Sequence, residues 1–223
     1  MTNILINGVS GKMGTSLLKF CASNKNVEIC DDLNDDSLEV IIDFSHPDST
    51  LKLLKSLPTK QISLIIGTTG LKEEHFQYIE EISKDKRILL APNLSKGISV
   101  LKNTIIDFID ENDKEWHCII EETHHDQKID SPSGTAIELK KIIESNNIKN
   151  LITDIEIISK RTGKIFGIHK IIFYKGTNRI EFMHESKSRN IYSDGALQAA
   201  HWIKDKKKGL YSFEDFMKSS NSL

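Results

Sequence analysis

The chain has 223 residues, of which 38% are hydrophobic and 28% are charged, and its formal net charge is −2. This is the composition of an ordinary globular protein with one large or two small domains, and the balanced charge gives no reason to expect a nucleic acid or an anionic membrane as partner. We find no apolar run that could span a bilayer and no signal peptide, and three scattered cysteines fit a reducing, cytoplasmic environment.

The chain opens with the pattern of a strand, a glycine turn and a helix. The apolar run Asn3–Asn7 precedes the motif GVSGKMG, and Thr15–Ala22 has apolar residues at helical spacing. In this context glycines allow the backbone to approach a pyrophosphate at the helix N-terminus. The spacing is GxxGxxG rather than the common GxGxxG, so the turn alone is weak evidence for a dinucleotide site.

A second strand is predicted at Val27–Cys30, followed by two aspartates. An acidic residue roughly 20 positions beyond the glycines often binds the adenosine ribose, which makes Asp31 a candidate. Asp31 and Asp32 could equally be turn residues. The next strand begins near Glu39, which leaves too few residues for a crossover helix. Either the second strand is rudimentary or a βα unit is missing.

Buried strands then alternate with helices, a pattern that predicts a doubly wound, Rossmann-like parallel sheet of the α/β class. The predicted strands are Glu39–Ser45, Ser63–Ile66 and Arg87–Ala91, and the predicted helices are Ser49–Ser56 and Glu73–Ser83. Ligands bind such sheets at the carboxyl ends of the strands, where the motifs GTTG and APNLS lie. GTTG could let a flat ring approach the backbone, or it could be an ordinary turn.

The second half of the chain predicts a different architecture. Strands follow one another without crossover helices, which indicates an antiparallel or mixed sheet in a smaller α+β domain. We expect a dinucleotide-binding domain at 1–95 and 191–223, because Leu210–Met217 is expected to pack back on the first domain. The second, substrate-binding domain is expected at 96–190. The predicted elements of the second domain are a helix at Gly97–Ile109 and strands at Cys118–Glu122, Ile152–Lys160, Lys170–Tyr174 and Arg179–Met183.

The stretch EETHHDQKIDSPSGTA concentrates polar chemistry between a strand and a helix. His124 and His125 can titrate near neutral pH, and Lys128 can donate a proton. We expect Ser131 to cap the following helix, with Pro132 in its first position. The start of a helix suits a carboxylate or phosphate. A surface loop with incidental histidines is the alternative, but the convergence of these features favours a small-molecule active site.

Five motifs occur in the order expected of one family: GVSGKMG, GTTG, APNLS, HHDQKIDSPSGTA and HESKSRNIYSDGALQAAHW. From about residue 3 to about 205 the chain resembles the 4-hydroxy-tetrahydrodipicolinate reductase family. HHxxKxDxPSGTA is the specific motif, whereas the glycine turn is not. The resemblance implies NADH- or NADPH-dependent reduction of a cyclic dicarboxylate in lysine and diaminopimelate biosynthesis, by a homotetramer built through the sheet of the second domain.

The resemblance also implies roles for individual residues. His124 matches the catalytic histidine, Lys128 the proton donor and His125 a substrate contact. The substrate-carboxylate loop is matched by Ser133, Gly134 and Thr135. The cofactor loops are matched by Gly8, Val9, Ser10, Gly11, Lys12 and Met13, by Gly67, Thr68 and Thr69, and by Ala91, Pro92, Asn93 and Leu94. No metal is expected. In a lysine-rich chain, a surface role is the better interpretation of Lys160 and Arg161 than anion binding.

Two departures from the family pattern stand out. The family usually carries a longer segment after the first helix, which grips the ribose and selects the nucleotide, so the choice between NADH and NADPH stays open. The family also often has a glutamate where this chain has Ile168, for which we expect only a packing consequence.

Three rival functions remain. The first is another nicotinamide-dependent imine reductase or dehydrogenase, and the second is a non-catalytic nucleotide sensor. The third is a metal hydrolase using His124, His125 and Asp126. It is disfavoured because adjacent histidines are poorly spaced for joint chelation and a catalytic zinc usually has three protein ligands.

Overall fold

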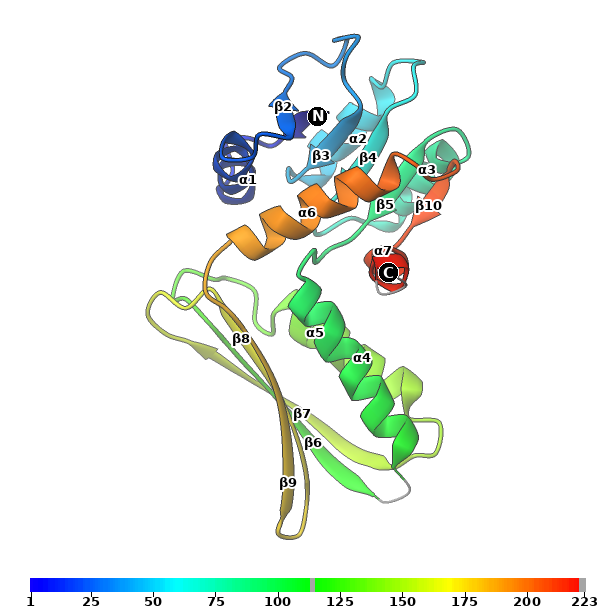
Figure 1. Ribbon diagram of the computed structural model, residues 1–223. Helices are drawn as coiled ribbons and strands as arrows, with labels where there is room; N and C mark the ends of the chain where they lie inside the picture. The colour runs from blue at the N-terminus through cyan, green and yellow to red at the C-terminus, as the bar shows by residue number, and fades with distance from the viewer. Residues whose placement is uncertain (113–114, 221–223) are drawn as a thin grey trace. The chain divides into compact units, whose positions relative to one another are not determined.

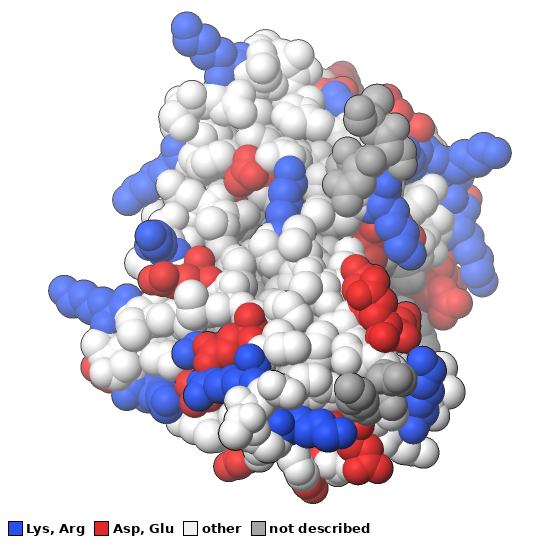
Figure 2. Space-filling view, turned by 60° about the horizontal axis from the view of Figure 1, so that its bottom comes forward, with Lys and Arg blue, Asp and Glu red and all other residues white. Residues whose placement is uncertain are grey.

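The computed structural model describes residues 1–112 and 115–220. The chain divides into two compact units, Met1–Ser95 with Arg189–Leu223 (unit 1) and Lys96–Ser188 (unit 2). The predicted domain ranges include 113–114 and 221–223, which lie outside the described residues. No helix of the described part has the length and apolarity needed to cross a membrane. On the face shown in Figure 2, basic and acidic side chains are interspersed, in keeping with the small net charge.

Unit 1 contains a six-stranded sheet in the order β10-β5-β4-β3-β1-β2, and every neighbouring pair is parallel. The strands are β1 (Thr2–Asn7), β2 (Val27–Ile29), β3 (Val40–Asp43), β4 (Ser63–Ile66), β5 (Arg87–Leu90) and β10 (Gly209–Tyr211). The helices are α1 (Lys12–Ala22), α2 (Pro47–Lys55), α3 (Glu73–Ser83), α6 (Asn190–Ile203) and α7 (Phe213–Ser220). The C-terminal segment therefore returns to this sheet and supplies one of its edge strands.

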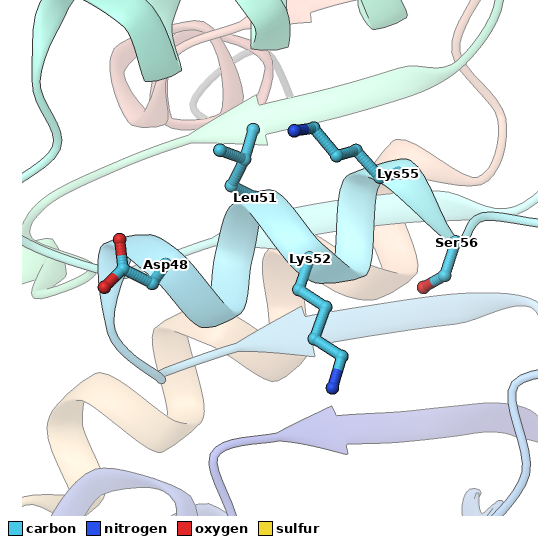
Figure 3. A pocket seen from close by; sticks show the side chains of 5 residues that line it. All are labelled: Asp48, Leu51, Lys52, Lys55 and Ser56. Carbon is cyan, nitrogen blue, oxygen red and sulfur yellow. The ribbon is translucent and has the colours of Figure 1, made fainter.

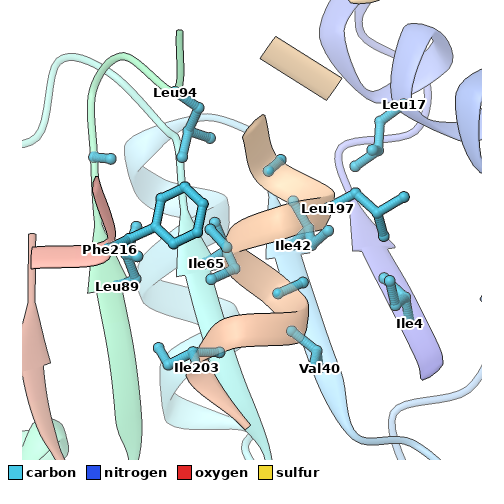
Figure 4. Packing of buried hydrophobic residues seen from close by; sticks show 14 of the residues in the cluster. Ile4, Leu17, Val40, Ile42, Ile65, Leu89, Leu94, Leu197, Ile203 and Phe216 are labelled. Atoms are coloured by element: carbon cyan, nitrogen blue, oxygen red, sulfur yellow. The ribbon is translucent and has the colours of Figure 1, made fainter. Parts of the chain in front are cut away.

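Both faces of this sheet are covered, which explains why its central strands are continuous apolar runs. On one face, Ile65 and Leu89 pack with Leu197 of α6 and Phe216 of α7 (Figure 4). Alternate residues point to opposite faces of a strand. The opposite face therefore packs on α2 and α3, through Leu54, Leu64, Ile66, Ile79 and Ile88. The predicted doubly wound parallel sheet is confirmed, and α6 lies along one of its faces (Figure 1).

The chain between β2 and β3 shows how the short second βα unit is accommodated. Both strands pair in parallel with β1, one on each side of it. The connection from Cys30 to Glu39 therefore crosses to the other side of β1, and it contains no helix. β2 is left as a three-residue edge strand. Both sequence interpretations hold, because the strand is rudimentary and no crossover helix accompanies it.

Unit 2 contains a four-stranded sheet in the order β7-β6-β8-β9. The strands are β6 (Trp116–His124), β7 (Ile152–Arg161), β8 (Gly167–Lys175) and β9 (Asn178–Ser186). β6 and β7 are parallel, and the other two pairings are antiparallel, so of the two predicted forms, antiparallel or mixed, the sheet has the mixed one. α4 (Lys96–Glu111) and α5 (Gly134–Asn146) cover one face (Figure 1), and α5 is the crossover from β6 to β7.

The core of unit 2 fixes which strand residues face the helices. Cys118 and Ile120 of β6 and Phe173 of β8 pack against Ile105 and Leu139 from the two helices. Because side chains alternate, the residues two and four positions beyond Ile120 share its face. β6 is longer than the predicted strand Cys118–Glu122. His124 therefore lies on the strand, facing the helices.

Candidate functional site

At the carboxyl end of β6, the helix-facing side of the sheet changes from apolar to polar. One cross-strand row follows Ile120 and consists of Ser159, Glu122, His169 and His184, on β7, β6, β8 and β9 in turn. In the next row, Arg161 pairs with His124. The sheet register thus gathers a carboxylate, a guanidinium and three imidazoles at one end of the core. Residues of β6, β7 and β8 from this cluster, together with the segment from His124 to Thr135, form what we call the β6 site.

The Glu122 carboxylate is fully buried at the centre of the β6 site. It accepts hydrogen bonds from Nδ1 of His124, from the backbone N–H of Ser133 (3.2 Å) and from Nη2 of Arg161 (2.8 Å). Burial alone would raise the pKa of Glu122, but the hydrogen bonds from Arg161 and His124 hold that pKa below its usual range. Glu122 is therefore an ionised acceptor that joins the strand to the residue before α5.

His124 is a neutral imidazole with a defined orientation. Burial lowers its pKa; Glu122 opposes that effect, and the positive charges of Lys128 and Arg161 reinforce it. Because Nδ1 faces an ionised carboxylate, Nδ1 carries the proton and Nε2 is left as an acceptor. A Cβ added at Gly167 would lie 3.0 Å from Nε2, so the glycine leaves room for the imidazole.

His169 lies beside His124, with ring centroids 5.2 Å apart in an edge-on arrangement. Its Nε2 is 3.3 Å from Oγ of Ser133, and its Nδ1 has no hydrogen-bond partner among the described residues. Burial lowers the pKa of His169 to about 3, and the neighbouring His124 adds to this shift. His169 is therefore a neutral wall of the β6 site.

The start of α5 differs from the sequence prediction. Ser133, not Ser131, is the N-cap, and Pro132 lies before the helix rather than in its first position. The Ser133 backbone is extended, and its Oγ accepts the Ala136 N–H at 3.2 Å. The Ser-Pro pair satisfied the general preference for helix starts, but the hydrogen bond from the Ser133 N–H to Glu122 fixes the cap two residues later. Gly134 is exposed, and no atom lies within 4 Å of the place where its Cβ would be.

The structure places the other predicted residues of this segment between His124 and the helix. The Lys128 backbone N–H donates to the His125 carbonyl at 3.1 Å, closing a turn. Nζ of Lys128 lies 2.8 Å from Oδ1 of Asp130. Nδ1 of His125 is buried without a partner among the described residues, and Thr135 lies in the first turn of α5. The segment thus offers a proton donor, an acceptor and the N-terminus of a helix.

Three contributors to the β6 site were missed: Glu122 and His169 were not predicted from the sequence, and the expected surface role of Arg161 is wrong, because its half-buried guanidinium donates to the buried Glu122 carboxylate. They belong to strands that are far apart in the chain and meet only through pairing. The sequence signal that could have revealed Glu122 is the two-residue period of a strand, because Glu122 precedes His124 by two positions. On β8, His169 likewise follows Gly167 by two positions. Once a catalytic residue is placed on a strand, its neighbours at that spacing share its face.

In unit 1, the predicted pyrophosphate turn combines a close backbone approach with an uncapped helix start. Gly8 has a φ of +88°, and a Cβ there would lie 2.6 Å from the Phe44 carbonyl oxygen. α1 begins at Lys12, and its N-cap Gly11 provides no side-chain cap. The first turn therefore keeps backbone N–H groups for an anion. Exposed residues in this turn are Val9, Ser10, Gly11 and Lys12, and Met13 is partly buried.

A buried carboxylate ties this turn to the neighbouring loops. Asp43, at the end of β3, is fully buried and accepts hydrogen bonds from side-chain and backbone groups of three segments. Its donors are Asn7 Nδ2 (2.9 Å), Ser45 N (3.1 Å), Ser45 Oγ (2.6 Å), Thr50 Oγ1 (2.5 Å) and Thr68 Oγ1 (3.0 Å). The predicted cofactor residue Thr68 thus directs its side chain inward. From the sequence, Asp43 was given no role, because it ends an apolar run whose pattern indicates only a strand.

The remaining predicted cofactor residues lie at the same carboxyl edge of the sheet but differ in exposure. Gly67 packs against the ring of Phe44, where a Cβ would be 2.4 Å from a ring carbon. Ala91 and Leu94 are buried in the core of unit 1. Exposed residues are Asp31, Thr69 and Pro92, and the Asn93 side chain accepts the Ser95 N–H at 2.9 Å.

Neither metal-binding clusters nor the hollow on α2 adds a further candidate site among the described residues. Within the described residues, no group of three or more His, Cys, Asp or Glu side chains is arranged to hold a metal ion. A shallow hollow of about 430 Å³ lies on α2 and is lined by Asp48, Leu51, Lys52, Lys55 and Ser56 (Figure 3). All five lining residues come from the helix or its C-terminal end, and none belongs to the β6 site or to the glycine turn.

Comparison with known proteins gives a consistent result along the chain. A family model described as "Dihydrodipicolinate reductase, N-terminus" matches residues 24–94, and one described as "Dihydrodipicolinate reductase, C-terminus" matches residues 97–217. The chain is 36% identical to a 4-hydroxy-tetrahydrodipicolinate reductase of Rickettsia rickettsii, with 98% of this chain and 100% of the relative covered. The corresponding protein of Thermosipho africanus is 35% identical, with 96% of each chain covered.

Solved structures agree on the fold. A dipicolinate-bound dihydrodipicolinate reductase from Paenisporosarcina sp. TG-14 superposes with a TM-score of 0.74 at 20% identity, covering 96% of this chain and 99% of that one. An amine dehydrogenase from Mycobacterium smegmatis has a TM-score of 0.64 at 7% identity, covering 96% and 95%. At these identities the likeness establishes the fold alone.

Proposed function

The chain belongs to the dihydrodipicolinate reductase family, and from this premise we propose that it reduces 4-hydroxy-tetrahydrodipicolinate to tetrahydrodipicolinate with NADH or NADPH. This reaction belongs to lysine and diaminopimelate biosynthesis. The observation that carries the proposal is the β6 site, where one buried carboxylate holds both His124 and the residue that caps α5.

The substrate is a cyclic dicarboxylate, so its site needs anion donors. The N-terminus of α5 supplies them through the backbone around Gly134 and Thr135, with Ser133 fixing the first turn. Gly134 is exposed and unobstructed, which suits close approach of a carboxylate. His125 is a further substrate contact, because its buried Nδ1 lacks a partner within the described chain.

The net reaction takes up one hydride and one proton and releases the 4-hydroxyl group as water. A bound nicotinamide nucleotide supplies the hydride. Lys128 donates the proton to the ring as general acid, and Asp130 holds its ammonium group. His124, neutral and with Nε2 unprotonated, assists this transfer as an acceptor, or it takes up a proton from solvent at Nε2 and passes that proton to Lys128.

Residues of unit 1 would hold the nucleotide. The uncapped N-terminus of α1 and the close backbone approach at Gly8 fit a pyrophosphate. The loops after β4 and β5 (Gly67–Thr69 and Ala91–Leu94) lie at the same edge and would border the nicotinamide. Asp31, at the end of β2, would face the adenosine ribose.

We also place the protein in the cytoplasm as a homotetramer. All three cysteines are buried free thiols, which fits a reducing compartment. The side of the unit 2 sheet away from α4 and α5 carries apolar side chains, including Ile119, Ile168 and Met183, of which Met183 is 59% exposed. Ile168 thus faces away from the β6 site, which supports a packing role. A second copy of the sheet would cover this side, and light scattering that gives a monomer mass would contradict this assembly.

The direct test is a coupled assay in which dihydrodipicolinate synthase generates the unstable substrate. We expect oxidation of NADH or NADPH, followed by absorbance, that depends on both the synthase and this protein. Folded protein that oxidises neither nucleotide would contradict the proposed reductase.

A further inference from the structure

Glu122 holds the imidazole of His124 and the N-cap of α5 through different oxygen atoms. Oε2 accepts from His124 Nδ1, and Oε1 accepts from the Ser133 N–H and from Arg161 Nη2. Its side chain has no exposed surface, so it cannot contact substrate directly. Its influence must therefore pass through the groups that it holds.

The first group that Glu122 holds is the imidazole of His124, whose tautomer depends on which nitrogen faces the carboxylate. A carboxylate can only accept, so the nitrogen facing it must carry the proton, and the other nitrogen keeps its lone pair. The other charged or titratable groups around the imidazole are Arg161 on β7, His169 on β8 and Lys128 in the loop. Arg161 and Lys128 are cationic and His169 is neutral, so none of them competes with Glu122 for the Nδ1 proton.

The second group that Glu122 holds is the backbone N–H of Ser133, at the start of α5. The Ser133 N–H is bound by Oε1, and the Ser133 hydroxyl oxygen caps the Ala136 N–H. The position of the anion-binding turn is therefore fixed by the carboxylate that fixes the imidazole. Arg161 shares that oxygen and supplies the counter-charge that a buried carboxylate requires.

We propose that Glu122 is the positioning residue of the β6 site. It keeps His124 in the Nδ1–H tautomer, with Nε2 as proton acceptor, and it fixes the position of the N-terminus of α5 relative to that imidazole. The inference rests on the proposed function for the roles of His124 and α5. Its core claim, that Glu122 sets the tautomer, is independent of turnover.

The experiment measures the tautomer of His124 by NMR of protein labelled with ¹⁵N in histidine, assigned with a His124→Gln variant. In the wild type we expect Nδ1–H, and an Nε2–H tautomer would overturn the proposal without any Glu122 variant. In Glu122→Gln, the amide can present N–H to the imidazole, so we expect a shift towards Nε2–H. Retention of the wild-type tautomer in a folded Glu122→Gln protein would also overturn the proposal.

Kinetics supply the second readout. We expect Glu122→Gln to lower kcat by about 10- to 100-fold, the scale on which metal-binding histidines respond to the loss of an orienting partner, with NADH affinity unchanged. Glu122→Asp keeps a carboxylate and should recover part of kcat and the Nδ1–H tautomer. Glu138→Gln is the matched control, because it breaks the 2.6 Å ion pair with the buried Lys102 in the same unit without touching His124. An equal loss of kcat in the control would mean that any broken buried ion pair suffices, and would count against Glu122 as a positioning residue.

The two hypotheses fail separately. A wild type with the Nδ1–H tautomer that depends on Glu122, but with no nucleotide oxidation, would remove the proposed function and leave the role of Glu122. Normal turnover by a wild type with the Nε2–H tautomer would support the proposed function and overturn the role of Glu122.

Discussion

The hydroxyl of Ser133 lies 3.3 Å from Nε2 of His169, so the cap of α5 is bound to β8, a strand 36 residues further along the chain. Both side chains are buried. Ser133 is thus hydrogen-bonded to two strands, because its N–H donates to Glu122 on β6 and its hydroxyl pairs with His169 on β8. The helix start is thus held from two strands, as an anion site requires if it is to be preorganised.

The burial of His169 makes stability depend on pH. Its pKa is about 3 in the folded protein and near 6.5 when exposed, so the unfolded chain binds more protons between these values. Stability should therefore be fully present above about pH 6.5 and decline as pH falls, by about 2 kcal/mol at pH 5. Urea unfolding at pH 7 and pH 5 measures this loss. His169→Gln should flatten the decline, and an unchanged pH dependence in that variant would refute the assignment.

Lys128→Ala tests the proposed proton donor. We expect turnover to fall by about 10²- to 10⁴-fold, because general acid catalysis contributes on that scale. NADH affinity, measured by fluorescence of the bound nucleotide, should stay the same, since the proposed nucleotide residues belong to unit 1. Lys140→Ala is the matched control, because Lys140 makes only a 3.8 Å pair with Glu144 on α5. Near-normal turnover of Lys128→Ala would require another donor.

Asp43→Asn tests the network behind the nucleotide loops. The amide cannot accept at its nitrogen, so at least one buried hydroxyl or amide donor loses its acceptor. We expect a stability loss of about 2–4 kcal/mol together with weaker NADH binding, measured by urea unfolding and fluorescence titration. The exposed Asp48→Asn in α2 should change neither. Unchanged NADH affinity in Asp43→Asn would show that the loops hold their positions without this carboxylate.

The acidic end of β2 predicts a preference for NADH. Asp31 and Asp32 follow the edge strand beside β1, where the adenosine ribose of a bound dinucleotide is expected. Repulsion between the 2′-phosphate of NADPH and one such carboxylate costs about 1 kcal/mol in a water-like medium. NADPH should therefore bind at least about fivefold more weakly than NADH. The double variant Asp31→Ser, Asp32→Ser should narrow the ratio of the two KM values, whereas Asp36→Ser should leave it unchanged. A wild-type preference for NADPH would contradict this prediction.

Much of the fold was accessible from sequence because its signals are local. The Ser63–Ile66 strand and the Glu73–Ser83 helix have the predicted bounds, since each is set by its own apolar period and flanking turns. The prediction of an antiparallel or mixed second sheet followed from strands that succeed one another without crossover helices. These features depend on residues close together in the chain.

The β6 site was only partly accessible, since its hub depends on contacts between distant segments. His124 and Lys128 stand in a recognisable motif, but Glu122 gains its meaning from Arg161, which lies on another strand. The choice of Ser131 as helix cap failed for the same reason. A local preference for Ser-Pro was overridden by the hydrogen bond from Ser133 to the Glu122 carboxylate.

The position of β2 at the edge of its sheet also bears on how the chain tolerates changes in length. A strand inside a sheet cannot be shortened without breaking ladders on both sides, whereas an edge strand has one neighbour. The alignment with the Rickettsia rickettsii relative spans 242 positions, more than this chain contains, so that protein carries segments absent here. Because β1 pairs with β3 independently of the Cys30–Glu39 connection, that connection is a suitable graft point. A longer segment spliced there from a relative could change nucleotide selectivity while leaving the register of the central strands intact.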